Sequence, residues 1–285
     1  MTRWMITGAS GMLGTELVAR LRAEGQPVLA FRRHELDLRD TSAVHHLVEA
    51  CRPDVVVNCA AWNAVDEAET REDEALAVNG TGVRALAEAC GRVGARMIQP
   101  SSDYVFDGAA LDPYPEDARP RPVNAYGRTK LAGERAVLEA LPRGGYVVRT
   151  AWVYAATGHN FIRTMARLEG EGVAPGVVGD QFGQPTWAGD LAARIVDLAG
   201  SGAPPGVYHA TNSGQTSWYG LAREIFTLLG ADPVRVTEIS SKDFPRPAPR
   251  PAYSVLGHDG WRRAGLPPMR HWREALRESR VLAAD

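Results

Sequence analysis

The sequence has little cysteine, and what it has is not arranged as a disulfide framework or a metal site. Its 285 residues include three cysteines, Cys51, Cys59 and Cys90, with no CxxC pair. An odd number at these spacings favours reduced thiols over disulfides or metal ligands. Cys59 also lies inside the apolar run VVVNCAA, which is typical of a buried thiol. We therefore expect a reducing, cytoplasmic location and no bound metal.

Long apolar runs and blocks of like charge are also missing. The N-terminal segment MTRWMITGASGMLG lacks the apolar core of a signal peptide, and charged residues interrupt every later apolar stretch. This pattern predicts neither a signal peptide nor a membrane span. The 32 basic and 34 acidic residues are mixed along the chain and give a net charge of -2. We therefore expect a small-molecule partner, and no nucleic acid or membrane.

Short apolar runs typical of β-strands alternate with longer helical patterns through the first half of the chain. The runs are RWMIT, PVLAF, DVVVNCA, ARMIQP and GYVVRT, and the helical patterns cover residues 12–23, 42–50, 72–93 and 124–141. This alternation predicts parallel strands joined by crossover helices. We expect an α/β fold in which residues 1–150 form a doubly wound parallel sheet.

The second half is less regular and richer in proline and glycine. Loops such as GDQFGQPTWAGD and SSKDFPRPAPRPAYSVL predict a smaller lobe, residues 151–285, that closes over a site. Within it, GVYHATN is typical of a short strand and SWYGLAREIFTLLG of a helix. We expect segments in about 187–215 to return to the main sheet.

A glycine-rich turn follows the first predicted strand. Gly8, Gly11 and Gly14 precede a helical pattern with leucines on one side. Glycines at this spacing allow a tight turn and a close approach to a pyrophosphate, whose charge the N-terminus of the next helix stabilises. The alternative is an ordinary strand-to-helix connection, but a turn that opens an alternating chain favours dinucleotide binding.

Two arginines follow the second predicted strand and bear on the choice of cofactor. In such folds an acidic residue here binds the ribose of NAD, whereas a basic residue accommodates the 2′-phosphate of NADP. Arg32 and Arg33 follow directly after the run PVLAF, so we predict NADPH. Glu35 and Asp37 lie close by, which leaves NADH possible, and the alternative for the arginines is a pair of solvated loop residues.

The segment NAYGRTKLAGERAV places Tyr126 and Lys130 four residues apart at the start of a predicted helix. Alone, this spacing is also typical of a solvated helical face. Ser102, however, follows the strand ARMIQP and is expected at the carboxyl end of the sheet, where ligands bind. Together the three residues form a plausible site for carbonyl reduction, in which Lys130 lowers the pKa of the Tyr126 phenol.

Several strings along the chain resemble one subgroup of the extended short-chain dehydrogenase/reductases. The glycine turn and YGRTK resemble the superfamily as a whole. The strings RPDVVVNCAAWNAVDEAE, SSDYVFDG, NAYGRTKLAGE, RTAWVYA, GHNF, DQFGQPT and RPAYSVL resemble the dTDP-4-dehydrorhamnose reductases within it. The likeness runs in order from Thr7 to near the C-terminus. It implies an NADP-binding Rossmann domain followed by a mainly substrate-binding lobe.

The resemblance implies three catalytic residues: Tyr126 as proton donor, Lys130, and Ser102 as the hydroxyl that polarises the ketone. Together with the glycine turn and the arginines, it implies cofactor contacts at Gly8, Gly11, Met12, Leu13, Gly14, Arg32, Arg33, Asp37, Leu38, Ala60, Ala61, Trp62 and Asn63, as well as Tyr126 and Lys130. The substrate contacts that it implies are Ser102, Asp103, Trp152, Asn160, Phe161, Gln184, Pro185, Arg250 and Ser254.

Some of these positions have ordinary structural alternatives. Trp152 could be a core aromatic residue, and Arg250 could be a solvated residue of a stiff proline-rich loop. Some relatives bind magnesium through acidic side chains, and Glu16, Asp190 and Glu278 stand near the corresponding positions. Scattered acidic residues are more often solvated, because a hard cation needs several converging oxygens, so we predict no metal.

The implied activity is NADPH-dependent reduction of the C4 ketone of a dTDP-4-keto-6-deoxy-L-hexose, in the biosynthesis of dTDP-L-rhamnose or a related deoxysugar. The partner would be the dTDP-sugar, and the protein a monomer or homodimer. One alternative is a nucleotide-sugar epimerase or dehydratase of the same superfamily, although Asp103 is followed by Tyr104 and not by the second acid of the dehydratases. Another is a non-catalytic NADP-binding regulatory subunit.

Overall fold

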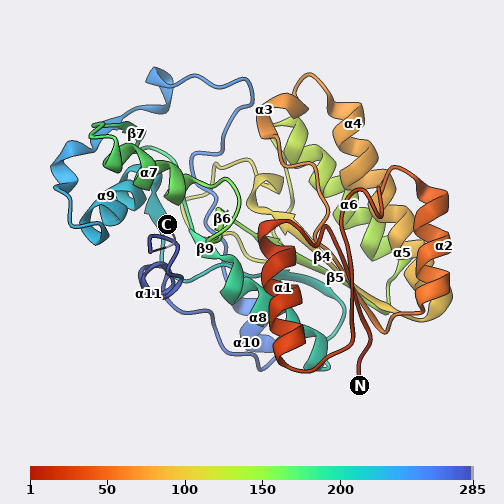
Figure 1. The fold of residues 1–285 in the computed structure, drawn as a ribbon. Helices are drawn as coiled ribbons and strands as arrows, with labels where there is room; N and C mark the ends of the chain where they lie inside the picture. Colours follow the sequence, from red (N-terminus) through yellow and green to blue (C-terminus); the bar gives the residue numbers. More distant parts are fainter. Residues whose placement is uncertain (284–285) are drawn as a thin grey trace.

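A six-stranded parallel sheet forms the centre of the molecule in the computed structural model, which describes residues 1–283 (Figure 1). The strand order is β10-β5-β4-β3-β1-β2, and every neighbouring pair is parallel. The strands are β1 (Trp4–Thr7), β2 (Val28–Phe31), β3 (Val55–Asn58), β4 (Arg96–Ser102), β5 (Gly145–Thr150) and β10 (Gly206–His209). This confirms the predicted α/β fold with a doubly wound parallel sheet.

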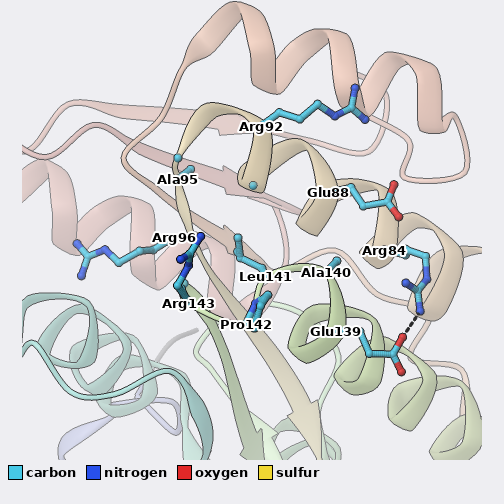
Figure 2. A pocket seen from close by; sticks show the side chains of 13 residues that line it. Arg84, Glu88, Arg92, Ala95, Arg96, Glu139, Ala140, Leu141, Pro142 and Arg143 are labelled. Atoms are coloured by element: carbon cyan, nitrogen blue, oxygen red, sulfur yellow. Dashed lines mark hydrogen bonds and ion pairs between the residues drawn. The ribbon is translucent and has the colours of Figure 1, made fainter.

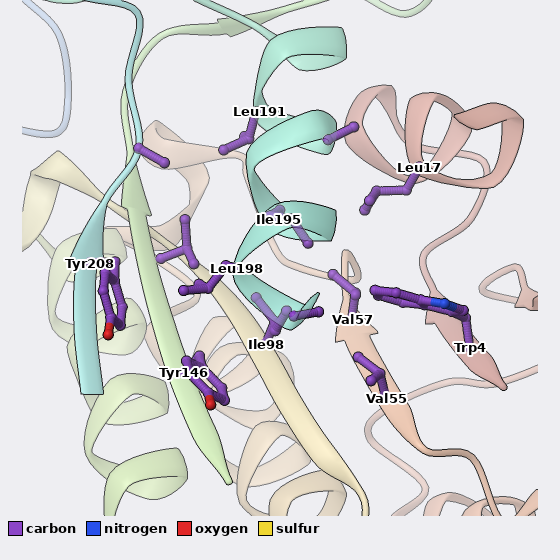
Figure 3. Packing of buried hydrophobic residues seen from close by; sticks show 14 of the residues in the cluster. Trp4, Leu17, Val55, Val57, Ile98, Tyr146, Leu191, Ile195, Leu198 and Tyr208 are labelled. Atoms are coloured by element: carbon purple, nitrogen blue, oxygen red, sulfur yellow. The ribbon is translucent and has the colours of Figure 1, made fainter. Parts of the chain in front are cut away.

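Helices cover both faces of the sheet, so its strands are apolar on both sides. Helices α1 (Met12–Ala23) and α8 (Ala188–Gly200) pack on one face, where Trp4, Val55 and Val57 meet Leu17 and Ile195 (Figure 3). Helices α2 (Thr41–Cys51), α5 (Gly82–Val93) and α6 (Ala125–Ala140) pack on the other. There the alternate strand residues, among them Met5 and Val56, are buried, as the two-residue period of a strand requires.

The single helix predicted over residues 72–93 is wrong. The structure divides it into α4 (Glu72–Leu76), a π-helical turn (Ala77–Thr81) and α5. The wider turn carries Asn79 inward, where its side chain accepts from the Trp62 N–H and donates to the Trp62 carbonyl and the Thr129 hydroxyl. Three hydrogen bonds to a buried amide explain why the regular helix is interrupted here.

The C-terminal lobe packs around its own apolar cluster, which includes Tyr154, Ile225, Phe226 and Trp272. Its helices are α7 (Phe161–Gly170), α9 (Trp218–Leu228) and α11 (Trp272–Glu278). Three short strand pairs accompany them: β6 (Val153–Tyr154) with β9 (Thr186–Trp187), β7 (Gly176–Val178) with β12 (Thr237–Ile239), and β8 (Phe182–Gly183) with β11 (Thr216–Ser217).

Later segments also join the first part of the chain. Strand β10 pairs with β5 at the edge of the sheet, and α8 packs beside α1. Helix α10 (Asp259–Arg263) places Trp261 in the same cluster. The remaining short helices are α3 (Val65–Ala68) and the 3-10 turns Asp103–Val105, Pro233–Arg235 and Ser241–Asp243. None of the helices in residues 1–283 is long and apolar enough to span a membrane.

Candidate active site

A cavity of about 450 Å³ opens at the carboxyl ends of strands β1, β3, β4 and β5. A larger hollow of about 770 Å³ lies at the other end of the sheet, where Arg96 begins β4 and Arg143 precedes β5 (Figure 2). Ligands of parallel α/β sheets bind outside the carboxyl ends of the strands. The smaller cavity is therefore the candidate active site.

The glycine turn forms one wall of this cavity, with Gly11, Met12 and Leu13 among its lining residues. Gly8 has a φ of +60°, and a Cβ there would lie 2.5 Å from the Ala60 nitrogen. A Cβ at Gly14 would lie 2.4 Å from the Gly8 carbonyl oxygen. Both positions therefore require glycine. Helix α1 begins at Met12 with no side-chain cap, so the N–H groups of its first turn are available to a phosphate.

The residues after β2 differ in whether their charges are engaged. Arg32 and Arg33 are exposed, and neither guanidinium forms an ion pair within residues 1–283. Asp37 is bound by the Arg39 guanidinium, with Arg39 Nε 3.0 Å from Asp37 Oδ1, and this hydrogen bond holds the Asp37 pKa below its usual value. Leu38 is buried. The two arginines, and not Asp37, are the charged groups left available for a cofactor.

The segment after β3 contributes unevenly. Ala61 and Asn63 line the cavity, and Ala60 packs against Gly8. The Trp62 indole is held elsewhere, because its Nε1 donates to the Ala64 carbonyl at 3.0 Å and the Arg71 guanidinium lies 4.7 Å from its ring centre. The Trp62 backbone remains at the site through its hydrogen bonds to Asn79.

The three residues predicted to be catalytic all line the cavity. Ser102 ends β4, and Tyr126 lies in the first turn of α6, where the Asn124 side chain caps the helix by accepting from the Gly127 N–H at 2.8 Å. Lys130 follows one turn later, is 6% exposed, and donates through Nζ to the Pro100 carbonyl at 2.8 Å. The end of β4 and the start of α6 thus bring the hydroxyl, phenol and ammonium groups together in one cavity.

The pKa values of the two titratable groups are shifted by burial. Burial lowers the pKa of Lys130 to about 8, and the Glu134 charge partly opposes this. The pKa of Tyr126 is raised well above its usual value, first by burial and then by the Asp103 charge, although a hydrogen bond with Ser102 acts in the other direction. The expected net lowering of the Tyr126 pKa is therefore not found in the protein alone, because burial and the Asp103 charge together raise it. A neutral phenol is, however, the form that a proton donor requires.

A buried carboxyl group completes this corner of the cavity. Asp103 accepts hydrogen bonds from Ser102 Oγ at 3.0 Å and from Ser254 Oγ at 2.5 Å. Burial raises the pKa of Asp103 to about 6, against the lowering effect of both hydroxyl groups. Three residues predicted to contact substrate thus meet, although Ser254 comes from a distant loop.

Trp152 is far from the glycine turn in the sequence but lines the same cavity. It has a φ of +47°, which is unusual for a bulky residue. Its ring stacks on that of Trp218, with 3.5 Å between ring centres and 8° between planes. Trp218 also lines the cavity.

Known proteins match this chain over most of its length. A family profile described as the RmlD substrate binding domain matches residues 2–282. The chain belongs to the dTDP-4-dehydrorhamnose reductase family. A dTDP-4-dehydrorhamnose reductase from Streptomyces griseus is 55% identical over 281 residues, which cover 97% of this chain and 92% of the relative. The family predicted from the sequence is thereby confirmed.

Two further members extend the comparison. A dTDP-4-keto-6-deoxy-D-glucose reductase from Streptomyces niveus is 53% identical, covering 97% of this chain and 96% of the relative. The crystal structure of dTDP-4-dehydrorhamnose reductase from Bacillus anthracis, in complex with NADP, is 38% identical with a TM-score of 0.95 and covers 98% of this chain and 99% of that one. This chain is thus an oxidoreductase of the dTDP-4-dehydrorhamnose reductase type.

Six predicted substrate contacts do not line the main cavity: Asn160, Phe161, Gln184, Pro185, Arg250 and Ser254. Asn160 caps α7 and donates to the Ala155 carbonyl, and Phe161 packs on Trp218. Both line a small neighbouring cavity of about 90 Å³. The side chain of Gln184 is buried and bonds both backbone groups of Leu256, and Pro185 is buried beside it.

Arg250 is also engaged within the protein. Its guanidinium forms an ion pair with Asp66 at 2.5 Å, and Arg246 binds the same carboxylate. The Ala248 N–H donates to Asp66 at 3.2 Å. These hydrogen bonds lower the pKa of Asp66 to about 2, against the effect of burial. Asp66, which lies in α3, thereby binds the proline-rich loop that contains Arg246 and Arg250.

Sequence reasoning missed Tyr104 and Trp218, which line the cavity, and Asp66, which binds Arg250. Tyr104 packs edge-on against Tyr126, with ring centres 5.9 Å apart and an interplanar angle of 81°. Its position next to Asp103 indicates that Tyr104 belongs to the site. The sequence around Trp218 indicates only the start of a helix. The acidic residues compared with a metal site are partly engaged, since Asp190 and Glu278 both bind Arg270.

Proposed function

We propose that the protein reduces the C4 ketone of a dTDP-4-keto-6-deoxy-L-hexose with NADPH, in the biosynthesis of dTDP-L-rhamnose or a related deoxysugar. The observation that carries this proposal is the meeting of Ser102, Tyr126 and Lys130 in one cavity with the glycine turn. A hydroxyl, a neutral phenol and an ammonium group are the set that carbonyl reduction requires. The names of the two Streptomyces relatives support the broader class of dTDP-4-keto-6-deoxyhexoses, and one of them names a D-hexose.

The residues of the cavity fit NADPH. The start of α1 and the glycine turn would hold the pyrophosphate, because no side chain caps the first N–H groups of the helix. Arg32 and Arg33 would bind the 2′-phosphate, and the presence of NADP in the Bacillus anthracis structure supports this choice. Ala61, Asn63 and Lys130 line the cavity beyond the turn, and Lys130 would hold the nicotinamide ribose.

In the proposed reaction NADPH supplies a hydride to C4 of the sugar. Ser102 would turn its single hydroxyl proton, which Asp103 accepts in the structure, toward the C4 oxygen and so polarise the ketone. Tyr126 would transfer its phenolic proton to the same oxygen. The ketone thereby becomes a secondary alcohol. The raised pKa of Tyr126 keeps the phenol protonated before this step. Lys130 favours the phenolate that the transfer leaves, because its charge lies one helical turn away.

The surroundings of Asp103 favour reduction over dehydration. In residues 1–283 the side-chain hydrogen bonds of its carboxyl group go to the hydroxyl groups of Ser102 and Ser254, and not to a second acid. Tyr104 occupies the next position and packs against Tyr126. A regulatory role without catalysis is disfavoured because such a protein has no chemical need for Ser102, Tyr126 and Lys130 in one cavity.

The test is turnover of dTDP-4-keto-L-rhamnose with NADPH, followed by loss of NADPH absorbance and by NMR identification of the product. We expect absorbance loss and a 4-hydroxy product. As a control, Tyr126→Phe should still bind NADPH but lose about 10²-fold or more of turnover. Tight NADPH binding without any turnover, across a panel of dTDP-4-keto sugars, would contradict the proposal.

A further inference from the structure

Trp152 is held in a backbone conformation that costs free energy. Its φ of +47° places a bulky side chain in the left-handed region, where residues other than glycine are uncommon. Such strain persists only where surrounding contacts impose it, and it is concentrated at functional sites. The contacts that hold Trp152 in this backbone conformation must therefore involve its side chain or neighbouring residues.

Both faces of the Trp152 ring are covered. Trp218 stacks on one face with a ring-centre separation of 3.5 Å. A Cβ at Gly183 would lie 2.6, 2.7 and 2.8 Å from the Cε2, Cζ2 and Nε1 atoms of Trp152. Three nearly equal distances to bonded neighbours place Gly183 over a ring face and not beside an edge. Because Trp218 covers one face, Gly183 lies on the other.

This sandwich decides which part of Trp152 a ligand meets. Trp152 lines the main cavity together with Ser102 and Tyr126, yet neither of its faces is open. The ring therefore presents an edge to the cavity. Trp218, like Trp152 and Val153, lines both the main cavity and the small cavity of about 90 Å³. Phe161, which lines the small cavity, packs on Trp218 with 4.7 Å between ring centres.

We propose that Trp218 is a positioning residue for the sugar: it clamps Trp152 against Gly183 and so fixes the Trp152 edge that the sugar contacts. This inference rests on the proposed function. Trp218 is well placed for the role, because it is the first residue of α9, whose start is fixed by the Ser217 cap. An aromatic stack on a capped helix is a rigid support, whereas a lone tryptophan at a positive φ could relax to another conformation.

The stack has a spectroscopic signature that does not depend on activity. Two indoles at this separation couple their excited states and give an exciton couplet in far-ultraviolet circular dichroism. We expect the couplet in the wild-type protein and its loss in Trp218→Phe and Trp218→Leu. Trp187→Phe is the matched control, because Trp187 is similarly half-buried but lines neither cavity, and it should keep the couplet.

The kinetic expectation separates positioning from folding. Trp218→Leu should raise KM for the sugar about tenfold, with the affinity for NADPH unchanged, and Trp218→Phe should restore part of the loss. Gly183→Ala disturbs Trp152 from its other face and should raise the same KM without touching Trp218.

Three outcomes would overturn the inference. They are a wild-type protein without the couplet, variants that lose the couplet but keep wild-type KM and kcat, and variants in which NADPH affinity falls together with sugar affinity. A wild-type protein that shows the couplet and binds NADPH but reduces no dTDP-4-keto sugar would overturn the proposed function, and with it the role of Trp218 toward a sugar. The couplet thus distinguishes the two failures.

Discussion

Ser254 donates a hydrogen bond to Asp103 over 2.5 Å, although 151 residues separate them in the sequence. The bond joins the C-terminal loop to the end of β4, beside Ser102 and within the wall that contains Tyr126. A carboxyl group buried at this junction is sensitive to pH in the range where enzymes are assayed, because its pKa is about 6.

The first prediction concerns stability. The Asp103 pKa is about 6 in the folded protein against a usual 3.8, so the folded state binds this proton more tightly than the unfolded chain. The group therefore adds stability as pH falls through 6 toward 4. Between pH 7 and 4.5, the free energy of unfolding of the wild type should rise by about 2 kcal/mol relative to Asp103→Asn. Urea denaturation at both pH values measures this, and parallel pH dependence in the two proteins would contradict it.

A second prediction concerns the pH dependence of cofactor capture. Burial lowers the Lys130 pKa to about 8, so the free enzyme loses this positive charge as pH rises through 8. We expect kcat/KM for NADPH to fall above that pH, since this parameter reports groups of the free enzyme. Ionisation of Tyr126 should not add to this fall in the pH profile, because its pKa is raised. A profile that stays flat to pH 10 would exclude Lys130 from cofactor binding.

The exposed pair Arg32 and Arg33 should set the preference for NADPH. Charge-assisted hydrogen bonds to a phosphate contribute about 1.5–3 kcal/mol, so Arg32→Ala and Arg33→Ala together should weaken NADPH binding by about 10- to 100-fold. Affinity for NADH serves as the internal control and should change little. Fluorescence titration of both cofactors measures the ratio, and an equal loss for NADH would show that the arginines do not read the 2′-phosphate.

Asp66 should control the mobility of the proline-rich loop. Asp66→Asn removes the charge that binds Arg246 and Arg250 and weakens the acceptor of the Ala248 N–H. We expect faster hydrogen exchange at Ala248 in the variant. The Ser241 amide, which donates to Asp180 at 2.9 Å, provides the control and should keep its exchange rate. Unchanged exchange at Ala248 would mean that the loop is held by other contacts.

Local patterns were sufficient for much of the fold. The helix predicted over residues 12–23 begins and ends at those residues, because its leucines and the glycines before it are close in sequence. The strand-end position of Ser102 and the four-residue spacing of Tyr126 and Lys130 likewise fix where these groups lie once the sheet is parallel. Periodicity and strand order therefore predict the three residues as neighbours.

Contacts between distant segments could not be predicted in the same way. The ion pair between Asp66 and Arg250 joins residues 184 positions apart, and no local pattern encodes it. The packing of Trp152 between two residues depends on Gly183 in β8 and on Trp218 in α9, which are far apart in the sequence. The direction of the Tyr126 pKa shift depends on burial and on Asp103, neither of which the spacing of Tyr126 and Lys130 reveals.

The π-helical turn at Ala77–Thr81 has one more consequence. Asn79 binds the backbone of Trp62 on one side and the Thr129 hydroxyl on the other, and that hydroxyl donates to the Tyr126 carbonyl at 2.8 Å. The Asn79 side-chain amide thus connects the segment after β3 to the first turn of α6. A leucine of similar size would fill the space but leave both sides free to drift apart. Under the proposed function, the placement of the cofactor and of the proton donor would therefore depend on Asn79, a residue that does not itself line the cavity.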